Sequence, residues 1–215
     1  MRIIAGRFRR RKLLTSPGTT TRPITDRVKE TLFERIDASL QQARVADVFA
    51  GTGTIGLEAL SRGAQSVVFI EQDRAAHELL QQNVATLGAG DQTICWRTDA
   101  LRSSFRPQGG EACLPYDVVF FDPPYRMIER LRVGSPLYRS LQRLARPAVS
   151  SSGARLVLRT PERAHFELPD AWRIDWTLTM SNMDIHGYTT SPVEDASDSE
   201  CASKELIDRD ADGAD

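Results

Sequence analysis

Four consecutive residues, Asp122-Pro123-Pro124-Tyr125, have the clearest chemical potential in this sequence, and they directly follow the apolar run 116–121. The run predicts a buried parallel strand, and ligands of open α/β sheets bind just beyond the carboxyl ends of such strands. The Asp122 carboxylate and the Pro123 carbonyl could each accept one N–H of an amino group, and the prolines stiffen the turn. Tyr125 offers a flat face for stacking an extruded base. The combination suits methylation of an exocyclic amino nitrogen on a nucleobase. An ordinary strand-terminating turn is the alternative.

A glycine-rich loop stands earlier, between a predicted strand and a predicted helix. Gly51, Gly53 and Gly56 satisfy the spacing G-x-G-x-x-G, and Glu71 ends the next predicted strand. The pattern is typical of cofactors that contain adenosine, NAD among them, because the glycines admit the ligand and the acid binds its ribose. Taken alone, the loop does not distinguish between these cofactors.

Two further acids favour S-adenosylmethionine over NAD. Asp47, four residues before Gly51, could orient the ammonium group of the methionine moiety, whereas the pyrophosphate of NAD would gain nothing from a nearby anion. Asp99, after the third predicted strand, could accept a hydrogen bond from the adenine amino group. Close-packing glycines and ordinary strand-end acids are the alternatives for each residue taken singly. We predict a cofactor site made of Asp47, Gly51, Gly53, Glu71, Asp99 and Ala100.

Charge is distributed very unevenly along the chain. Residues 1–30 carry nine arginine and lysine residues against two acids, and residues 191–215 carry nine acids against two basic residues. A basic arm predicts a polyanionic partner, with a merely solvated charged terminus as the alternative. The acidic tail, poor in aromatic residues, is predicted to be disordered. The predicted RNA-binding residues are Arg2, Arg7, Arg9, Arg10, Arg11, Lys12 and Arg22.

Length and composition exclude several classes of protein. The 215 residues suffice for one α/β domain with small additions, and no stretch approaches the 18 apolar residues of a membrane span. The three cysteines lack C-x-x-C spacing, and the three histidines are scattered, so neither a disulfide framework nor a metal site is expected. No signal peptide is apparent. We expect a cytoplasmic monomer with no membrane partner.

Strands that alternate with helices imply a parallel sheet covered on both faces. We predict an α/β, Rossmann-like fold with a mostly parallel seven-stranded sheet and a C-terminal antiparallel hairpin. The predicted strands are 44–50, 66–71, 93–97, 116–121, 155–159, 172–180 and 185–190, and the predicted helices are 27–43, 54–62, 73–87 and 136–146. The expected division is a basic RNA-binding arm (1–25), a catalytic domain (26–190) and an acidic tail (191–215).

Four motifs together resemble the bacterial family that methylates the N2 of a guanine in small-subunit ribosomal RNA. They span residues 1–13 (M-R-I-I-A-G-R-F-R-R-R-K-L), residues 21–33, where Ile24 replaces a threonine of the family pattern, residues 47–64, and residues 122–125. The resemblance covers residues 1–125 well and 126–190 loosely, and residues 150–152 and 184–188 match no family pattern. It implies a class I methyltransferase fold, S-adenosylmethionine as cofactor, and 16S-type ribosomal RNA or the small ribosomal subunit as partner.

Three other functions compete with this interpretation. A DNA adenine or cytosine amino-methyltransferase shares the active-site turn but usually carries a target-recognition domain, for which this chain has no room. A non-catalytic RNA-binding ribosome assembly factor would not need every acidic site position to remain acidic. An NAD oxidoreductase would need an acid or base for hydride transfer after the fourth strand, and the sequence offers none.

Overall fold

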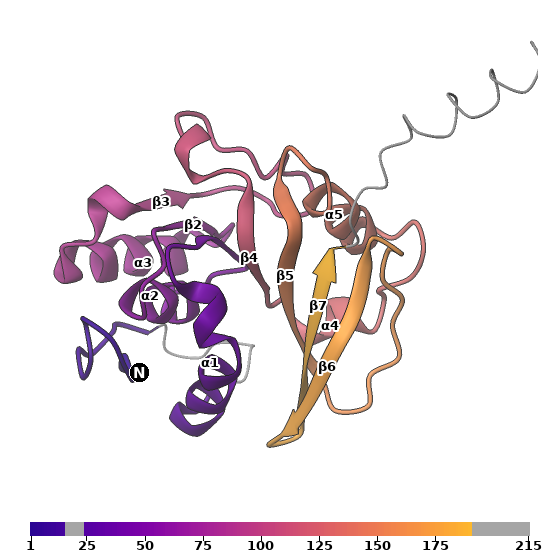
Figure 1. Cartoon of the computed structure of the whole chain (residues 1–215), viewed down its shortest axis with the longest axis horizontal. Coiled ribbons are helices and arrows are strands. Elements are labelled where there is room, and N and C mark those ends of the chain that lie inside the picture. The colour runs from indigo at the N-terminus through magenta and orange to yellow at the C-terminus, as the bar shows by residue number, and fades with distance from the viewer. Residues whose placement is uncertain (16–23, 191–215) are drawn as a thin grey trace, which may run out of the picture.

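A seven-stranded sheet organises the chain in a computed structural model that describes residues 1–15 and 24–190 (Figure 1). The strand order is β3-β2-β1-β4-β5-β7-β6. Strands β1 to β5 run parallel, β7 pairs antiparallel with β5, and β6 pairs antiparallel with β7. This arrangement confirms the predicted fold. The strands are β1 (Arg44–Val48), β2 (Ser66–Ile70), β3 (Thr93–Trp96), β4 (Tyr116–Phe121), β5 (Ser150–Pro161), β6 (Trp172–Met180) and β7 (Met183–Thr190).

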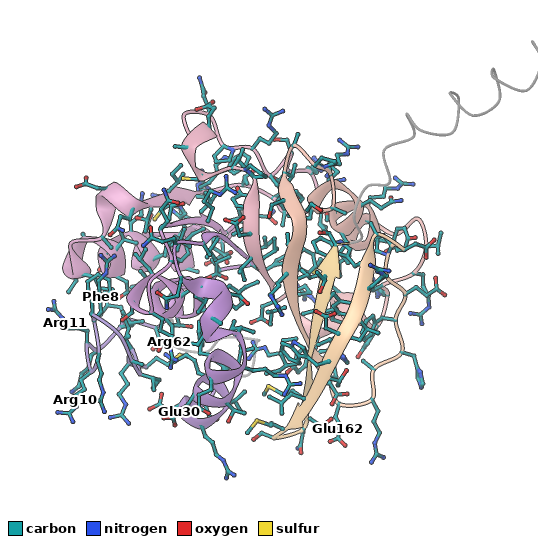
Figure 2. All side chains as sticks on the ribbon, in the orientation of Figure 1. Phe8, Arg10, Arg11, Glu30, Arg62 and Glu162 are labelled. Atoms are coloured by element: carbon teal, nitrogen blue, oxygen red, sulfur yellow. The ribbon has the colours of Figure 1, made fainter. Side chains whose placement is uncertain are left out.

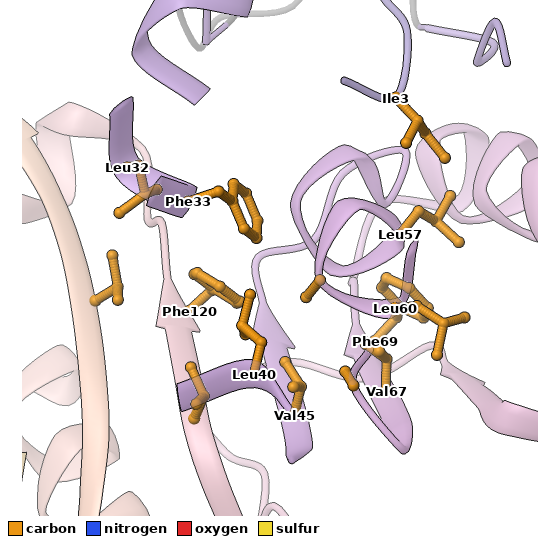
Figure 3. Close-up of a cluster of buried hydrophobic side chains, with 14 of the residues drawn as sticks. Ile3, Leu32, Phe33, Leu40, Val45, Leu57, Leu60, Val67, Phe69 and Phe120 are labelled. Carbon is orange, nitrogen blue, oxygen red and sulfur yellow. The ribbon is translucent and has the colours of Figure 1, made fainter. Parts of the chain in front are cut away.

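Helices cover both faces of the sheet, and successive strand residues point alternately into two buried clusters. Val45 and Phe120 lie in the cluster under the first three helices, whereas Ala46 and Phe121 lie in the cluster under the last two. Figure 3 shows the first cluster, where the Phe33 and Phe120 rings lie 5.7 Å apart, centre to centre. The helices are α1 (Asp26–Leu40), α2 (Thr54–Ser61), α3 (Arg74–Leu87), α4 (Tyr125–Ile128) and α5 (Pro136–Leu144), with short 3-10 turns η1 (Gly90–Gln92) and η2 (Glu111–Cys113).

Local capping residues fix where the helices begin and end. The Thr25 hydroxyl accepts a hydrogen bond from the Val28 N–H at 3.3 Å, which caps α1. Helix α3 ends at Gly88, whose φ of 64° is left-handed. The predicted end of α1 near Ala43 is wrong, because Gln42 adopts a φ of 59° and donates its N–H to the carbonyl of Gly63 instead of continuing the helix.

Strand β5 begins earlier than the predicted residue 155. Ser150 pairs with Tyr116, after which the register between β4 and β5 shifts before Val118 pairs with Arg155. Serine and glycine have low strand propensity, so residues 150–153 carry no local strand signal. The extension exists because β4 offers them a partner.

The first fifteen residues pack onto the domain. Ile3 and Leu13 are buried and belong to the same apolar cluster as α1 and α2, and Arg2 forms an isolated antiparallel bridge with Lys12. Residues 1–15 thus form a hairpin, here called the basic hairpin, beside α2 (Figure 1). Arg22 and the acidic tail lie outside the described residues. Within the described ranges, no helix combines the length and the apolar character needed to cross a membrane.

Candidate active site

The candidate site lies where the strand order reverses, between the carboxyl ends of β1 and β4. Asp47 of β1 stands opposite Phe120 of β4 in the register, and the Asp122 N–H donates to the Val48 carbonyl at 3.2 Å. The glycine loop after β1 and the proline turn after β4 are therefore neighbours. In open α/β sheets, such a reversal of strand order is where ligands bind.

Arg159 binds the carboxylate of Asp122 side-on, through two nitrogens of its guanidinium group. Its Nε donates to Oδ1 at 2.8 Å and its Nη2 donates to Oδ2 at 2.5 Å. The arginine side chain is 10% exposed and the aspartate side chain 25% exposed, so the pair is largely removed from water. Burial opposes the charge on Arg159, but the neighbouring Asp122 carboxylate outweighs it and raises the arginine pKa. This side-on geometry fixes the plane of the carboxylate.

The proline turn leads directly into helix α4. Pro123 is buried, and α4 begins at Tyr125, which is half-buried. The N–H of Met127 donates to the Pro124 carbonyl at 2.8 Å, so the first helical hydrogen bond bypasses the carbonyl of Pro123. Ile24 and Leu32 line a small cavity of about 20 Å³ together with Asp122 and Arg159. Helix α1 and its start thus cover the turn on one side.

Glu71 links the glycine loop to the start of α3 by hydrogen bonds. Its carboxylate accepts hydrogen bonds from the N–H groups of Gly51 and Asp73, both at 2.7 Å. Gly51 has a φ of 56°, and a Cβ added there would meet nothing within 4 Å. At Gly53, by contrast, a Cβ would lie 2.4 Å from Leu80 Cδ1. The loop is therefore packed at Gly53 and open at Gly51, where a ligand could approach the backbone.

Asp47 is a buried acid without a cationic partner among the described residues. It is 2% exposed, and its Oδ2 accepts a hydrogen bond from the Gly56 N–H at 2.8 Å. Burial, reinforced by the nearby charges of Asp122 and Glu71, raises its pKa to about 8 against the opposing effect of the Gly56 hydrogen bond. A ligand with an ammonium group would supply the missing positive charge.

The third predicted acid shapes the loop after β3. Asp99 Oδ1 accepts a hydrogen bond from the Leu101 N–H at 2.9 Å, and Ala100 between them is buried. Leu101 borders an open pocket of about 490 Å³ together with Arg126 and Met127 of α4. Asp99 does not line this pocket; its carboxylate acts on the backbone of its own loop.

The predicted RNA-binding residues lie on a separate surface. Arg2 forms an exposed ion pair with Asp26 at 2.9 Å. Arg7 donates to the Gln92 side chain at 2.5 Å, and Arg11 donates to the Thr86 carbonyl at 2.8 Å. The remaining members that the structure describes are exposed and form no ion pair with a described residue: Arg9, Arg10 and Lys12.

Sequence reasoning missed Arg159. It lies in β5, four strand positions after Arg155, in the stretch L-V-L-R-T, whose apolar residues are buried. A cation in a buried strand needs a counter-charge, and that requirement is the signal the sequence offers. Which acid supplies the charge depends on the pairing of β4 with β5, which the sequence does not state.

A family model described as "Conserved hypothetical protein 95" matches residues 1–173. The chain belongs to this family. Within it, the protein is 44% identical over 126 residues to ribosomal RNA small subunit methyltransferase D of Escherichia coli K12, across 59% of this chain and 61% of that relative. It is 37% identical over 126 residues to the putative rRNA methyltransferase YlbH of Bacillus subtilis, across 59% and 67% of the two chains. The alignment thus spans less than two thirds of the first relative's length.

Solved structures place the same fold among methyltransferases. The putative methyltransferase yhhF from Escherichia coli superposes with a TM-score of 0.71 at 30% identity, covering 89% of this chain and 98% of that one. An RNA methyltransferase from Salinibacter ruber, solved with S-adenosyl-L-homocysteine, superposes with a TM-score of 0.57 at 17% identity over 79% and 94% of the chains. The second likeness shows the fold alone. The fold is that of a class I, Rossmann-like methyltransferase.

Proposed function

We propose that this protein transfers a methyl group from S-adenosylmethionine to the exocyclic N2 of a guanine in small-subunit ribosomal RNA. The observation that carries the proposal is the Asp122 carboxylate, fixed by Arg159 in a proline turn that lies against the glycine loop. The relative from Escherichia coli, a small-subunit ribosomal RNA methyltransferase by name, supports the same substrate class.

The residues around the glycine loop fit the proposed cofactor. Gly51 leaves its backbone approachable, and the Glu71 carboxylate beside it can accept hydrogen bonds from ribose hydroxyls with its remaining lone pairs. Asp47 supplies a buried carboxyl group whose ionised form the methionine ammonium group would stabilise, and Asp99 follows β3, where its carboxylate could accept a hydrogen bond from adenine. When bound, the cofactor supplies an electrophilic methyl group on a sulfonium centre.

The proline turn would prepare the guanine amine for attack. Its lone pair is delocalised into the ring, so it is a weak nucleophile until two acceptors draw its N–H groups out of the ring plane. Asp122 and the Pro123 carbonyl are those acceptors, and Arg159 holds the first at a fixed angle. Once the nitrogen has gained the methyl group, Asp122 or water would take the surplus amine proton. Most of the acceleration would come from positioning.

Methyl-transfer assays on defined substrates test the proposal. The purified protein is incubated with S-adenosylmethionine and one of three substrates: naked 16S-type ribosomal RNA, small subunits from cells that lack the enzyme, or a DNA duplex. The nucleosides are then analysed by mass spectrometry. We expect N2-methylguanosine. Methylated adenine or cytosine in a DNA duplex would instead support a DNA amino-methyltransferase. RNA binding without any methyl transfer would support an assembly factor.

The substrate determines the expected partner and cell compartment. An enzyme that modifies small-subunit ribosomal RNA works where that RNA is assembled, which in bacteria is the cytoplasm. We therefore propose the RNA or the small subunit itself as the partner. The ratio of activity on naked RNA to activity on assembled subunits measures which of the two the enzyme prefers.

A further inference from the structure

An open pocket of about 630 Å³ lies on the β6–β7 hairpin, apart from the residues assigned to the cofactor and to the substrate amine. The two strands contribute Ile174, Thr177, His186 and Tyr188, and the segment 164–168 between β5 and β6 contributes further side chains. The volume lies within the range of about 300–1,000 Å³ that is usual for small-ligand sites. The pocket is therefore large enough for a ligand, and the function proposed above does not use it.

The pocket is close to the candidate active site. Leu158 of β5 pairs with Phe121 of β4 on one side and with His186 of β7 on the other. Neighbouring strands are about 4.8 Å apart, so the backbone of His186 is roughly 10 Å from the residue before Asp122. A stacked nucleic acid strand covers that distance in about three nucleotides, at roughly 3.4 Å each. A ligand in the pocket and a base at Asp122 could therefore belong to one RNA strand.

Three aromatic rings line the pocket. The ring centres of Phe166 and His186 are 5.4 Å apart at an angle of 67°, and those of His186 and Tyr188 are 6.2 Å apart at 44°. Phe166 and His186 are half-buried, whereas Tyr188 is buried. The steep angle between Phe166 and His186 forms a corner, in which a planar group could stack on one ring and meet the edge of the other. This geometry suits a flat, aromatic ligand.

Hydrogen bonds hold the His186 ring in a fixed orientation. Thr160 Oγ1 lies 3.1 Å from Nε2 and donates its own proton to the Pro161 carbonyl, so it accepts the Nε2 proton. Thr177 Oγ1 lies 3.0 Å from Nδ1 and donates to it. Burial lowers the pKa of His186 against the opposing charge of Asp184, so the ring is neutral at pH 7. Because both nitrogens are engaged, His186 offers a ligand the surface of its ring.

The segment between β5 and β6 is bonded to the loop after α4. Arg132 Nη1 donates to the His165 carbonyl at 3.1 Å. The Glu167 N–H donates to the Leu131 carbonyl at 3.0 Å. Figure 2 shows Glu162, near the start of the segment, beside the tip of the β6–β7 hairpin. This side of the pocket is therefore formed before a ligand arrives.

Exposed apolar side chains stand at the mouth of the pocket. Ile174 lines the pocket and is 56% exposed, and Val133, which follows the lining residue Arg132, is 71% exposed. They are two of the four large apolar side chains that are exposed among the described residues. Exposed apolar surface that borders a pocket is typical of a binding site.

Cations follow the proline turn along the chain toward the pocket. Arg126, Arg130 and Arg132 are exposed, with Glu129 as the one acid between them. Arg132 has no partner for its Nε and Nη2 within the described ranges, so these atoms could bind a phosphate. Glu167, an acid in the lining of the pocket, already accepts a backbone N–H at 3.0 Å. An aromatic pocket beside exposed arginines suits a nucleotide, which combines a flat base with a phosphate.

We propose that this pocket binds a second nucleobase of the substrate RNA, a near neighbour of the guanine that is methylated, with a phosphate on Arg132. This inference rests on the function proposed above. Extruding the target guanine unstacks the bases beside it, and stacking one of them between Phe166 and His186 replaces part of the lost stacking. The pocket thereby holds the strand while the target guanine lies at Asp122, and binding depends on a base that does not react.

Combined changes in the protein and in the RNA test for a direct contact. Phe166→Leu keeps the site apolar but removes the ring, and an abasic nucleotide is placed in turn at each position of a fluorescent fragment of small-subunit RNA. Anisotropy without cofactor gives the Kd of every combination. We expect Phe166→Leu to weaken binding about 5- to 150-fold, the loss on truncating an aromatic side chain that stacks on a base. At one position near the target guanine, the abasic fragment should weaken binding to the wild type but not weaken binding to the variant further.

Tyr138→Leu is the matched control, and Phe166→Tyr is the conservative variant. Tyr138 of α5 is half-buried and packs against the same apolar cluster as Phe166, but it does not line the pocket. Both variants should bind the intact fragment as the wild type does. Unchanged binding in Phe166→Leu, equal losses in Phe166→Leu and Tyr138→Leu, or additive losses at every RNA position would overturn the proposal. Arg132→Gln should flatten the slope of log K against log salt by about 0.7, and an unchanged slope would refute the phosphate contact.

Failure of this inference can be told apart from failure of the proposed function. Guanine methylation without any coupled nucleotide would refute the inference alone, whereas a coupled nucleotide in RNA that is never methylated would refute the function alone. A loss confined to assembled subunits, with naked RNA bound normally, would mean a protein partner and would overturn the inference. Calorimetry with S-adenosylhomocysteine should give equal affinity in the wild type and in Phe166→Leu. If Phe166→Leu fails to fold, Ile174→Glu, which places an anion at the mouth of the pocket, takes its place.

Discussion

Arg159 fixes the orientation of the Asp122 carboxylate, which we propose as the acceptor for the amine of the substrate base. Each carboxylate oxygen has room for two hydrogen bonds, and the guanidinium takes one on each. The remaining lone pairs point away from Arg159, in directions set by the plane of the pair. An acceptor held in this way is organised before the substrate arrives, which is where positioning gains most of its effect.

At Asp122, we expect the Asp122→Ala variant to lose methyl transfer while its affinity for S-adenosylhomocysteine changes only a few-fold. The carboxylate is assigned to the substrate amine, so its loss should appear in kcat and not in cofactor binding. Arg159→Met should lower kcat about a hundredfold with KM little changed, because the Asp122 carboxylate would be free to shift by up to about an ångström from its reacting position. Arg155→Met, on the same strand but paired at 4.0 Å with the exposed Asp175, is the matched control. Near wild-type turnover in Asp122→Ala would contradict the assignment.

If Asp47 binds the cofactor as proposed, we expect cofactor binding to depend on pH. Because its pKa is about 8 in the ligand-free protein, this acid is mostly protonated at pH 7. An ammonium group bound beside it favours the charged form, so cofactor binding should release a proton at pH 7, up to about one per cofactor. Calorimetry of S-adenosylhomocysteine binding in buffers of different ionisation enthalpy measures this release. Asp47→Asn should abolish it, and an unchanged proton count in that variant would assign the release elsewhere.

Asp47 also makes the free energy of unfolding depend on pH. Its folded-state pKa of about 8 lies above the unfolded value of about 3.9, so the folded protein holds the proton more tightly. Between those two values the unfolded state binds fewer protons, and the free energy of unfolding contributed by Asp47 falls as pH rises. The stabilising contribution is complete below about pH 4 and lost above about pH 8.

At the level of elements, Glu71 links two loops that the sequence separates by a helix and a strand. One carboxylate receives the N–H of Gly51 after β1 and the N–H of Asp73 at the start of α3. Asp99 acts within its own loop, on the N–H of Leu101. Loss of Glu71 should therefore disturb the shape of the glycine loop in addition to removing the proposed ligand contact.

We expect Glu71→Ala to weaken the binding of S-adenosylhomocysteine more than Asp99→Ala does. Each variant removes a hydrogen bond with a charged acceptor, worth about 1.5–3 kcal/mol or roughly 10- to 150-fold in Kd. Glu71→Ala should lie at the upper end, because the N–H groups of Gly51 and Asp73 both lose their acceptor, whereas Asp99→Ala deprives the N–H of Leu101 alone. Titration calorimetry measures both. Equal affinities in wild type and both variants would contradict the proposed cofactor site, and binding of NAD in place of S-adenosylhomocysteine would contradict the methyltransferase function.

The sequence predicts elements best where the signal is local. Helices α1 and α3 are specified by residues within one or two turns, and the structure confirms both predicted helices, apart from the end of α1. The amino-terminal part of β5 and the contact of Arg159 with Asp122 depend on which strands pair. Pairing is a property of the assembled sheet, so no local pattern reports it. The cofactor and substrate assignments at Asp47, Glu71, Asp99 and Asp122 stay predictions.

At the scale of the whole molecule, we expect the free energy of unfolding to depend strongly on the buried charges under the basic hairpin. Lys29 and Glu58 are both fully buried, and Glu58 also has Arg62 as a partner. Removing the acid leaves a buried ammonium group with only the Arg2 carbonyl, at 2.5 Å. Removing the lysine leaves an acid that still has a cation and two backbone donors. The two losses are therefore unequal.

We expect Glu58→Met to lower the free energy of unfolding by about 3–5 kcal/mol, and Lys29→Met by clearly less. The double variant should recover part of the loss, because it leaves no uncompensated charge. Urea denaturation measures all three. Arg74→Met, which breaks the exposed ion pair with Glu78, is the control and should change stability by less than about 0.5 kcal/mol. A control as damaging as Glu58→Met would mean that burial is not the cause.

The position of Glu58 also sets an order of events during synthesis. The Ile4 N–H donates to the Glu58 carboxylate, 54 residues further along the chain, so at about 5–20 residues per second the acceptor is made roughly 3–10 s after the donor. Throughout that interval the cations of the hairpin have no native scaffold. The hairpin can adopt its final form only after α1 and α2 exist, and it therefore joins a domain that is already forming instead of nucleating one.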